Sequence, residues 1–204
     1  MDFTFAPPPI QRQLELGADL VIHSLTKYID GHGDALGGVV VGPKSIIETI
    51  HFPGMPCFTG ARLSPFNAWL ILRGMMTLDL RIRKHCENAL ALAAFLETHP
   101  LVDLVNYPAL PSHPQHALCL SQMNGMGGGI VSFWLKKNIA GLAPEEAAKR
   151  LLDHTRLMTI AISLGEGHTL IQIEHSGMIR VAVGLEGKED LLRDLSRALD
   201  SLRP

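Results

Sequence analysis

Lys27 is the residue of this 204-residue chain whose setting most favours covalent chemistry. It follows the apolar run at 20–22, which is typical of a buried strand. A lysine at the end of such a strand is partly desolvated, and desolvation favours the neutral amine, the form that attacks a carbonyl. The hydroxyls of Ser24 and Thr26 lie close by and, with backbone N–H groups, could hold a phosphate monoester. The pattern permits a nucleophilic lysine beside a phosphate site, but by itself it equally describes a solvated lysine in a surface loop whose hydroxyls cap the backbone.

The segment at 19–33 resembles the cofactor-lysine signature of the Cys/Met metabolism family, which includes cystathionine lyases and methionine gamma-lyases. Its members read Asp, an apolar run, and His-Ser-x-Thr-Lys-Tyr-x-x-Gly-His. Every fixed element is present here, with Leu25 where a smaller residue is usual. The resemblance extends along nearly the whole chain, through the segments at 2–6, 14–19, 63–69, 83–90, 163–166 and 180–186. It implies pyridoxal 5'-phosphate as cofactor and Lys27 as the catalytic Schiff-base lysine.

The resemblance also implies roles for five further residues, each matched to a family motif. Asp2 would bind the cofactor's ring nitrogen and keep it protonated, so that the ring can accept electrons. Ser24 and Thr26 would bind the cofactor phosphate. Arg180 would bind the substrate's α-carboxylate, because a planar guanidinium suits a bidentate grip. Ser163 would lie near the same carboxylate and near the lysine.

The composition excludes several classes of function. Lys plus Arg total 18 and Asp plus Glu total 20, and this balance argues against nucleic-acid binding. No apolar stretch reaches the roughly 18 residues of a membrane span, and residues 1–9 lack the basic and apolar regions of a signal peptide. The three cysteines are widely spaced, and the histidines show no metal-ligand spacing, so we expect neither disulfides nor a metal site. We therefore expect a cytoplasmic protein.

The elements that must position these residues follow an α/β pattern. The apolar runs at 20–22 and 39–41 suit strands of a parallel sheet that is buried on both faces. A stripe of apolar residues predicts a long helix at about 78–98. Other helices are expected at 10–16, 43–50, 64–75, 144–154 and 188–202, and strands at 102–107, 130–136, 157–162 and 178–183.

The resemblance assigns these elements to part of an aspartate aminotransferase-like, fold type I PLP-dependent transferase. Residues 1–80 would be the C-terminal part of the PLP-binding large domain. Residues 81–204 would form the small C-terminal α/β domain, with the long helix linking the two.

The resemblance implies a PLP-dependent lyase of sulfur amino acids, of the methionine gamma-lyase or cystathionine gamma- or beta-lyase type. A gamma-replacement enzyme remains open, namely an O-acetyl- or O-succinylhomoserine sulfhydrylase or a cystathionine gamma-synthase. A non-catalytic fragment also remains open. Pro56-Cys57 stands where methionine gamma-lyases carry a Lys-Asp pair, whereas the loop at 31–34 reads like the methionine-lyase version.

Family members are about twice as long as this chain, which resembles only their C-terminal half. The other half supplies a tyrosine that stacks on the cofactor and further phosphate-binding groups. A second gap is expected near His175-Ser176. Either the residues of both gaps belong to the protein and are only missing from this sequence, or the gene is truncated and rearranged. By resemblance, the partners would be a small amino-acid substrate and further copies of the chain, in a dimer of dimers whose active sites are shared between subunits.

Overall fold

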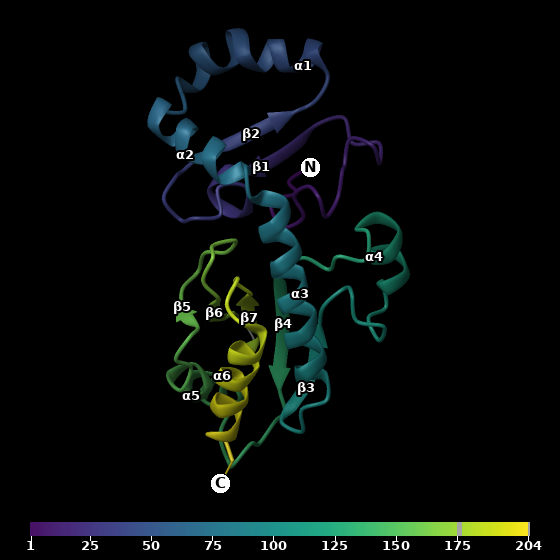
Figure 1. The fold of residues 1–204 in the computed structure, drawn as a ribbon, viewed down its shortest axis with the longest axis vertical. Coiled ribbons are helices and arrows are strands. Elements are labelled where there is room, and N and C mark those ends of the chain that lie inside the picture. Colours follow the sequence, from purple (N-terminus) through teal and green to yellow (C-terminus); the bar gives the residue numbers. More distant parts are fainter. Residues whose placement is uncertain (175–176, 204) are drawn as a thin grey trace.

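The structure is a computed structural model that describes residues 1–174 and 177–203. It is elongated, with a small sheet and its helices at one end and a larger sheet with its helices at the other (Figure 1). A single long helix, α3 (Leu78–Glu97), runs from the first end into the second. The two ends of the chain lie in different regions, the N-terminus beside the small sheet and the C-terminus at the far end of the molecule.

The small sheet carries the lysine segment. Its strands β1 (Val21–Ser24) and β2 (Gly38–Val41) pair antiparallel. The expectation of a parallel sheet buried on both faces is wrong for this pair, because the chain turns back on itself when Leu25 N donates to Gly37 O at 2.9 Å. Ile22 is also 44% exposed, so one face of the strand is open. The parallel neighbour of β1 is instead the N-terminal segment, where Asp2 bridges Ile22.

The larger sheet has the strand order β3-β4-β7-β6-β5, and only the β5–β6 pair is parallel. Its strands are β3 (Val102–Asn106), β4 (Ile130–Leu135), β5 (Thr159–Ile160), β6 (Leu170–Ile173) and β7 (Ile179–Ala182). The helices that pack with it are α3, α5 (Pro144–Asp153) and α6 (Lys188–Asp200).

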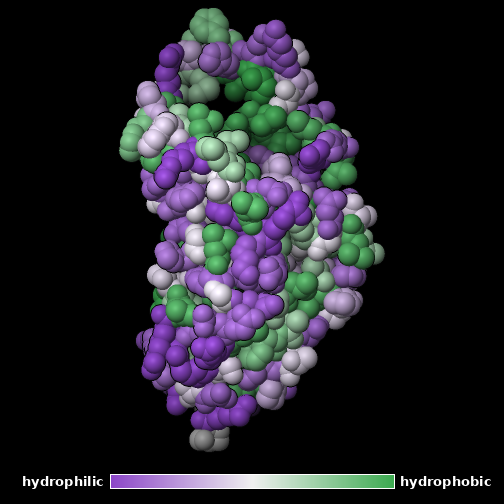
Figure 2. Space-filling model, in the orientation of Figure 1, coloured by the Kyte–Doolittle hydropathy of each residue, from purple (hydrophilic) through white to green (hydrophobic). Residues whose placement is uncertain are grey.

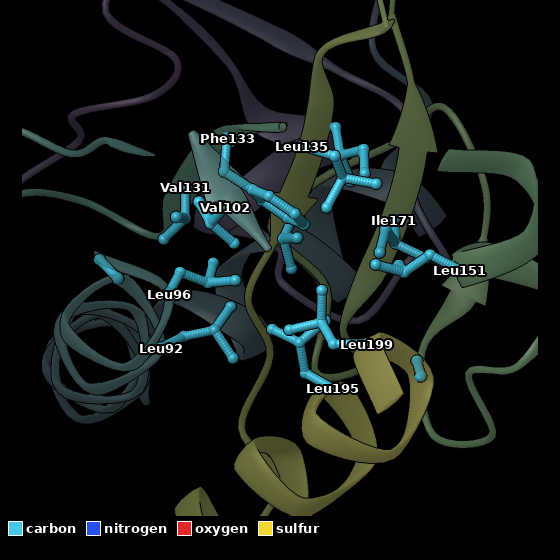
Figure 3. Close-up of a cluster of buried hydrophobic side chains, with 14 of the residues drawn as sticks. Leu92, Leu96, Val102, Val131, Phe133, Leu135, Leu151, Ile171, Leu195 and Leu199 are labelled. Atoms are coloured by element: carbon cyan, nitrogen blue, oxygen red, sulfur yellow. The ribbon is translucent and has the colours of Figure 1, made fainter. Parts of the chain in front are cut away.

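The main core lies between this sheet and the three helices. Phe133 of β4 is fully buried there, near Leu92 and Leu96 of α3 and Leu195 and Leu199 of α6 (Figure 3). Burial alternates strictly along β4, as expected of a strand with one face on the core. Among the described residues, no helix is both long enough and apolar enough to cross a membrane.

Most of the predicted elements are confirmed. The helices α1 (Lys44–Thr49), α2 (Pro65–Met75), α3, α5 and α6 lie where the sequence placed them, although the strand expected at 157–162 shortens to the two residues of β5. Ser64 caps α2 by accepting from Asn67 N at 3.1 Å. The helix expected at 10–16 is wrong, because this segment forms consecutive turns. Strand β6 and helix α4 (His116–Gln122) were not predicted.

Candidate functional site

Lys27 lies in a single wide helical turn, Leu25–Ile29, that directly follows β1. The turn is closed by Asp30 N, which donates to Leu25 O at 2.9 Å, and by Gly31 N, which donates to Lys27 O at 2.8 Å. Within the turn, only Lys27 departs from helical dihedral angles (φ −91°, ψ −130°), while Leu25, Tyr28 and Ile29 are buried. The neighbours of the lysine therefore anchor the turn in apolar surroundings.

The lysine side chain reaches a loop that is distant in sequence. Lys27 Nζ donates to Ser163 Oγ at 2.9 Å, across 136 residues. Gly165, two residues later, has φ +82°, and a Cβ there would lie only 2.6 Å from Tyr28 N and 3.0 Å from Lys27 C. Only glycine fits such a close approach in this conformation. The loop at 163–165 thus contacts both the side chain and the main chain of the lysine.

Arg180 of β7 reaches the same loop from the sheet. Its Nη2 donates to Ile162 O at 3.0 Å, to Ser163 O at 3.3 Å and to Gln172 Oε1 at 2.8 Å. Its Nε lies 3.8 Å from Glu174 Oε1, and its side chain is only 14% exposed. No hydrogen bond among the described residues occupies its Nη1, so this nitrogen remains for a ligand.

Asp2 is connected to the start of the lysine turn through Thr4. Its Oδ1 accepts from Thr4 N at 2.8 Å and from Thr4 Oγ1 at 2.7 Å, and Thr4 Oγ1 in turn accepts from Ser24 N at 2.9 Å. The two hydrogen bonds from Thr4 lower the pKa of Asp2, so the carboxylate stays anionic. Its Oδ2 accepts no hydrogen bond from the described residues and can meet a cationic ligand.

The two hydroxyls that were predicted to bind phosphate differ in their surroundings. Thr26 Oγ1 accepts from Gly37 N at 3.0 Å and donates to Gly37 O at 3.4 Å, so it helps to close the loop between β1 and β2. Ser24 Oγ takes part in no hydrogen bond of the described residues, although Ser24 N is bonded to Thr4. Ser24 is therefore the freer of the two for a phosphate, and both assignments stay predictions.

Sequence reasoning missed a row of buried polar side chains along α3. Arg81 donates to Tyr28 O at 2.7 Å and to Ile29 O at 3.2 Å, one turn of helix before His85. His85 Nδ1 lies 2.6 Å from Val183 O, and Asn88 Nδ2 donates to Gly184 O at 3.0 Å. Burial lowers the pKa of His85 to about 4, so its ring is neutral near pH 7. Their spacing of four and three residues on a helix was the signal that could have revealed them.

The structure thus gathers the predicted residues into two groups. Lys27, Ser163 and Arg180 meet at one loop. Asp2 and Ser24 are joined through Thr4 at the other end of the same turn. An amine, an anionic carboxylate and a free hydroxyl are the groups that an aldehyde cofactor with a phosphate and a basic ring nitrogen would require. The guanidinium, with its Nη1 unoccupied, suits a ligand that carries a carboxylate.

Three known proteins are similar to this chain over almost its full length. The L-methionine gamma-lyase of Treponema denticola is 44% identical, over 99% of this chain and 53% of its own length. The canavanine gamma-lyase of Rhizobium leguminosarum bv. trifolii is 40% identical, over 98% of this chain and 52% of its own. The crystal structure of cystathionine gamma synthase from Xanthomonas oryzae pv. oryzae in complex with aminoacrylate and cysteine matches with a TM-score of 0.90 and 38% identity, covering 98% of this chain and 55% of that one.

The chain therefore spans about half the length of the relatives it matches. The alignment with the Treponema enzyme covers 220 positions, more than the 204 residues of the chain, so the relative contains residues without a counterpart here. The gap expected near His175-Ser176 lies outside the described residues.

The family and the fold follow from these comparisons together with the site. The model of the Cys/Met metabolism PLP-dependent enzymes matches residues 1–200. The mixed α/β arrangement corresponds to part of a fold type I PLP-dependent enzyme, as the likeness to the cystathionine gamma synthase indicates. The chain belongs to the family of Cys/Met metabolism PLP-dependent enzymes.

Proposed function

We propose that the protein containing this chain is a PLP-dependent lyase of sulfur amino acids, which removes a sulfur leaving group from the γ or β carbon of a substrate such as methionine or cystathionine. The observation that carries the proposal is the meeting of Lys27 and Arg180 at one loop, with Lys27 Nζ 2.9 Å from Ser163 Oγ and Arg180 Nη2 3.3 Å from Ser163 O. An amine and a carboxylate-binding cation held by the same loop suit an amino-acid substrate.

The residues of the chain fit the cofactor. When bound, PLP supplies an electron sink for the electron pair that is released as the substrate loses its α-proton. Asp2, kept anionic by Thr4, would pair with the ring nitrogen. The free hydroxyl of Ser24 would donate to the phosphate, and Thr26 would add a second hydroxyl if its bond to Gly37 O is exchanged.

The chain's own side chains would orient the substrate and move its proton. Arg180 Nη1 would bind the α-carboxylate, while Nη2 is held in place by Ser163 O and Gln172. Arg180 Nε makes no hydrogen bond among the described residues, but it lies 3.8 Å from Glu174 Oε1, whose charge helps to hold the guanidinium in place. Lys27 Nζ would accept the α-proton as general base, and its hydrogen bond to Ser163 Oγ would orient the amine. With water and methionine, the products would be a keto acid, ammonia and a thiol.

Gamma replacement is the second candidate function. It is favoured by the TM-score of 0.90 to a cystathionine gamma synthase. A lyase would release keto acid from methionine or cystathionine, whereas a replacement enzyme would add a thiol to an activated homoserine ester. Product analysis with both substrates separates the two. A chain that binds cofactor but transforms neither substrate supports the third alternative, a non-catalytic fragment.

We further propose that the working protein is a homo-oligomer, a dimer of dimers whose sites are shared. Large apolar side chains such as Phe58 (83% exposed) and Met76 (84% exposed) are open to solvent at the small-sheet end, and such surface usually marks an interface. The three cysteines are free, which is consistent with a reducing compartment such as the cytoplasm.

The test uses the purified protein, incubated with PLP and then treated with borohydride, which fixes the cofactor to the lysine that carries it. Peptide mapping should find the label on Lys27, and a visible absorption band should precede reduction. The Lys27→Ala variant should lose both, whereas Lys84→Ala, a lysine on α3 that pairs with Glu87, should keep both. A label spread over other lysines, or equal in the Lys27→Ala variant, would overturn the proposal.

A further inference from the structure

We propose that Arg81 is a positioning residue for Lys27. Arg81 fixes the C-terminal end of the lysine turn, and in this way it sets the direction in which the Lys27 side chain points. The role of Lys27 rests on the proposed function. The anchoring of the turn does not, and the two can be tested separately.

One guanidinium joins three separate parts of the chain. Arg81 Nη1 donates to Tyr28 O at 2.7 Å, and Nη2 donates to Ile29 O at 3.2 Å and to Gly74 O at 2.8 Å. Its Nε donates to Thr77 Oγ1 at 3.1 Å. The carbonyls of the last residues in a helical turn lack partners within the turn, and a cation at that end both satisfies and stabilises them. Arg81 is therefore the C-terminal cap of the turn that carries the lysine.

The Arg81 side chain is buried against the lysine turn. Arg81 is only 7% exposed. A Cβ at Gly31, where φ is +72°, would lie 1.8 Å from Arg81 Nη1, and a Cβ at Gly74 would lie 2.3 Å from Asp30 O. Because Gly31 and Gly74 have no side chains, the guanidinium and the end of α2 can pack directly against the turn. Burial lowers the pKa of Arg81, and the nearby charge of Asp30 opposes this, so the side chain stays cationic at neutral pH.

The same helix also holds the strand that carries the candidate carboxylate-binding arginine. Beyond Arg81, one and two turns along α3, His85 and Asn88 bind the carbonyls of Val183 and Gly184, just after β7. A helix is a rigid spacer of 1.5 Å per residue. α3 therefore sets the lysine turn at a defined distance from β7, so loss of the Arg81 contacts would let Lys27 shift relative to Ser163.

The first measurement needs no cofactor. Hydrogen exchange should be followed at the amides of Asp30 and Gly31, which close the lysine turn, and at those of β4 as an internal reference. We expect exchange at the two turn amides to rise about tenfold or more in Arg81→Ala, because the turn opens locally while the core stays closed. The matched control is Arg83→Ala, two residues away on the exposed side of α3, where Asp79 is the arginine's one ion-pair partner among the described residues. It should leave both sets of amides unchanged.

The second measurement uses the protein loaded with PLP. In Arg81→Ala we expect the pH midpoint of the visible band to shift by about one unit and kcat to fall about 10- to 100-fold with a smaller change in KM, as for a misplaced catalytic group. Arg81→Lys keeps the charge and part of the hydrogen bonding, so it should recover part of both effects. A residue that only stabilises the fold would leave the midpoint in place.

Each outcome decides the matter. If wild-type protein labels Lys27 but Arg81→Ala behaves like Arg83→Ala in both measurements, Arg81 is no positioning residue. If wild type never labels Lys27, the proposed function fails, and faster exchange at the turn alone would still establish the anchor. If Arg81→Ala does not fold, as judged by the near-ultraviolet signal of Trp134 in β4, then Gly31→Ala replaces it, because its methyl group displaces the guanidinium. Unchanged turn amides in Gly31→Ala and Arg81→Lys would then overturn the anchor.

Discussion

The two ends of this molecule differ in how far they can bury their own apolar residues. Every member of the main core cluster lies at position 89 or later, between the five-stranded sheet and its helices. Residues 1–77 contribute only small clusters, such as Leu25, Ile29, Ala35 and Ile71. Of the 24 exposed large hydrophobic side chains in the described residues, 16 belong to residues 1–77. On the face drawn in Figure 2, hydrophobic residues gather at this end of the molecule.

The first region also has an apolar cavity of about 670 Å³ that is open to the surface. It lies along β1, β2 and α2, and its lining includes Val21, Val39, Ile71 and Leu72. Lys27 is not part of the lining, so the cavity is no candidate for the reaction site. Residues after position 77 therefore hold the main core, whereas residues 1–77 present a surface suited to further protein. The lysine is nevertheless anchored, because Arg81, Ser163 and Gly165 all come from the part that holds the main core.

Replacing one phenylalanine in each region should give the largest difference in the free energy of unfolding between the two regions. Phe133→Ala, in the main core, should lower the free energy of unfolding by about 3–5 kcal/mol, because it leaves a cavity that the sheet and helices cannot close. Phe58→Ala, where the ring is 83% exposed, should change it by less than about 0.5 kcal/mol. Urea denaturation measures both. Equal losses would show that the first region holds a core of its own.

Acid should next destabilise the junction on α3. Burial lowers the pKa of His85 from 6.5 to about 4. Between these two pH values, the unfolded chain therefore binds a proton at His85 that the folded chain does not bind. The free energy of unfolding should therefore be unaffected by His85 above pH 6.5 and fall by up to about 3 kcal/mol as the pH drops to about 4.

Denaturation curves at several pH values give the measurement. His85→Asn should flatten this part of the curve, whereas His51→Asn, at an exposed position of the first region, should keep the wild-type curve. A wild-type slope that survives in His85→Asn would assign the acid sensitivity to another group.

Two glycines with similar φ angles, one beside the lysine and one far from it, test whether the loop at 163–165 positions Lys27. Gly165→Ala should cost about 2 kcal/mol, because φ is +82° and the new methyl group meets Tyr28 N at 2.6 Å. Gly141→Ala, with φ +77° and nothing within 4 Å, should show only the backbone strain of about 1 kcal/mol. Borohydride labelling of Lys27 should fall in Gly165→Ala and stay normal in Gly141→Ala. Normal labelling in both variants would mean that the loop at 163–165 does not determine the position of Lys27.

The smallest effect on stability is expected at the open surface. The double variant Leu72→Ser, Met76→Ser should change the free energy of unfolding by less than about 0.5 kcal/mol, since both side chains are already exposed. It should reduce self-association in sedimentation experiments, because part of the apolar surface is removed. Leu104→Ser, Leu120→Ser makes the same kind of change in the second region and should leave association unaltered. If both variants act alike, the first region is not the interface.

The sequence predicted most elements because their signals are local. The apolar stripe that predicted α3 and the short apolar runs that predicted β1 and β2 depend on residues a few positions apart. It failed at 10–16, where consecutive turns replaced a helix, and at the pairing of β1 with β2. A buried parallel strand and a half-exposed antiparallel one can both carry an apolar run, so the pattern alone cannot separate them.

For the site, the sequence predicted the chemistry of Lys27 and its loop, because a signature of adjacent residues records local backbone needs and functional groups together. The division into domains near residue 80 remains a prediction. The resemblance also placed Ser163 near the lysine, and the tertiary structure supplied the hydrogen bond between them. The contacts of Arg180 with the same loop, and of the buried Arg81 with the end of the lysine turn, came from the tertiary structure alone. These contacts join residues 17 to 136 positions apart. Their geometry depends on how α3, β7 and the 163–165 loop pack, which no local pattern records.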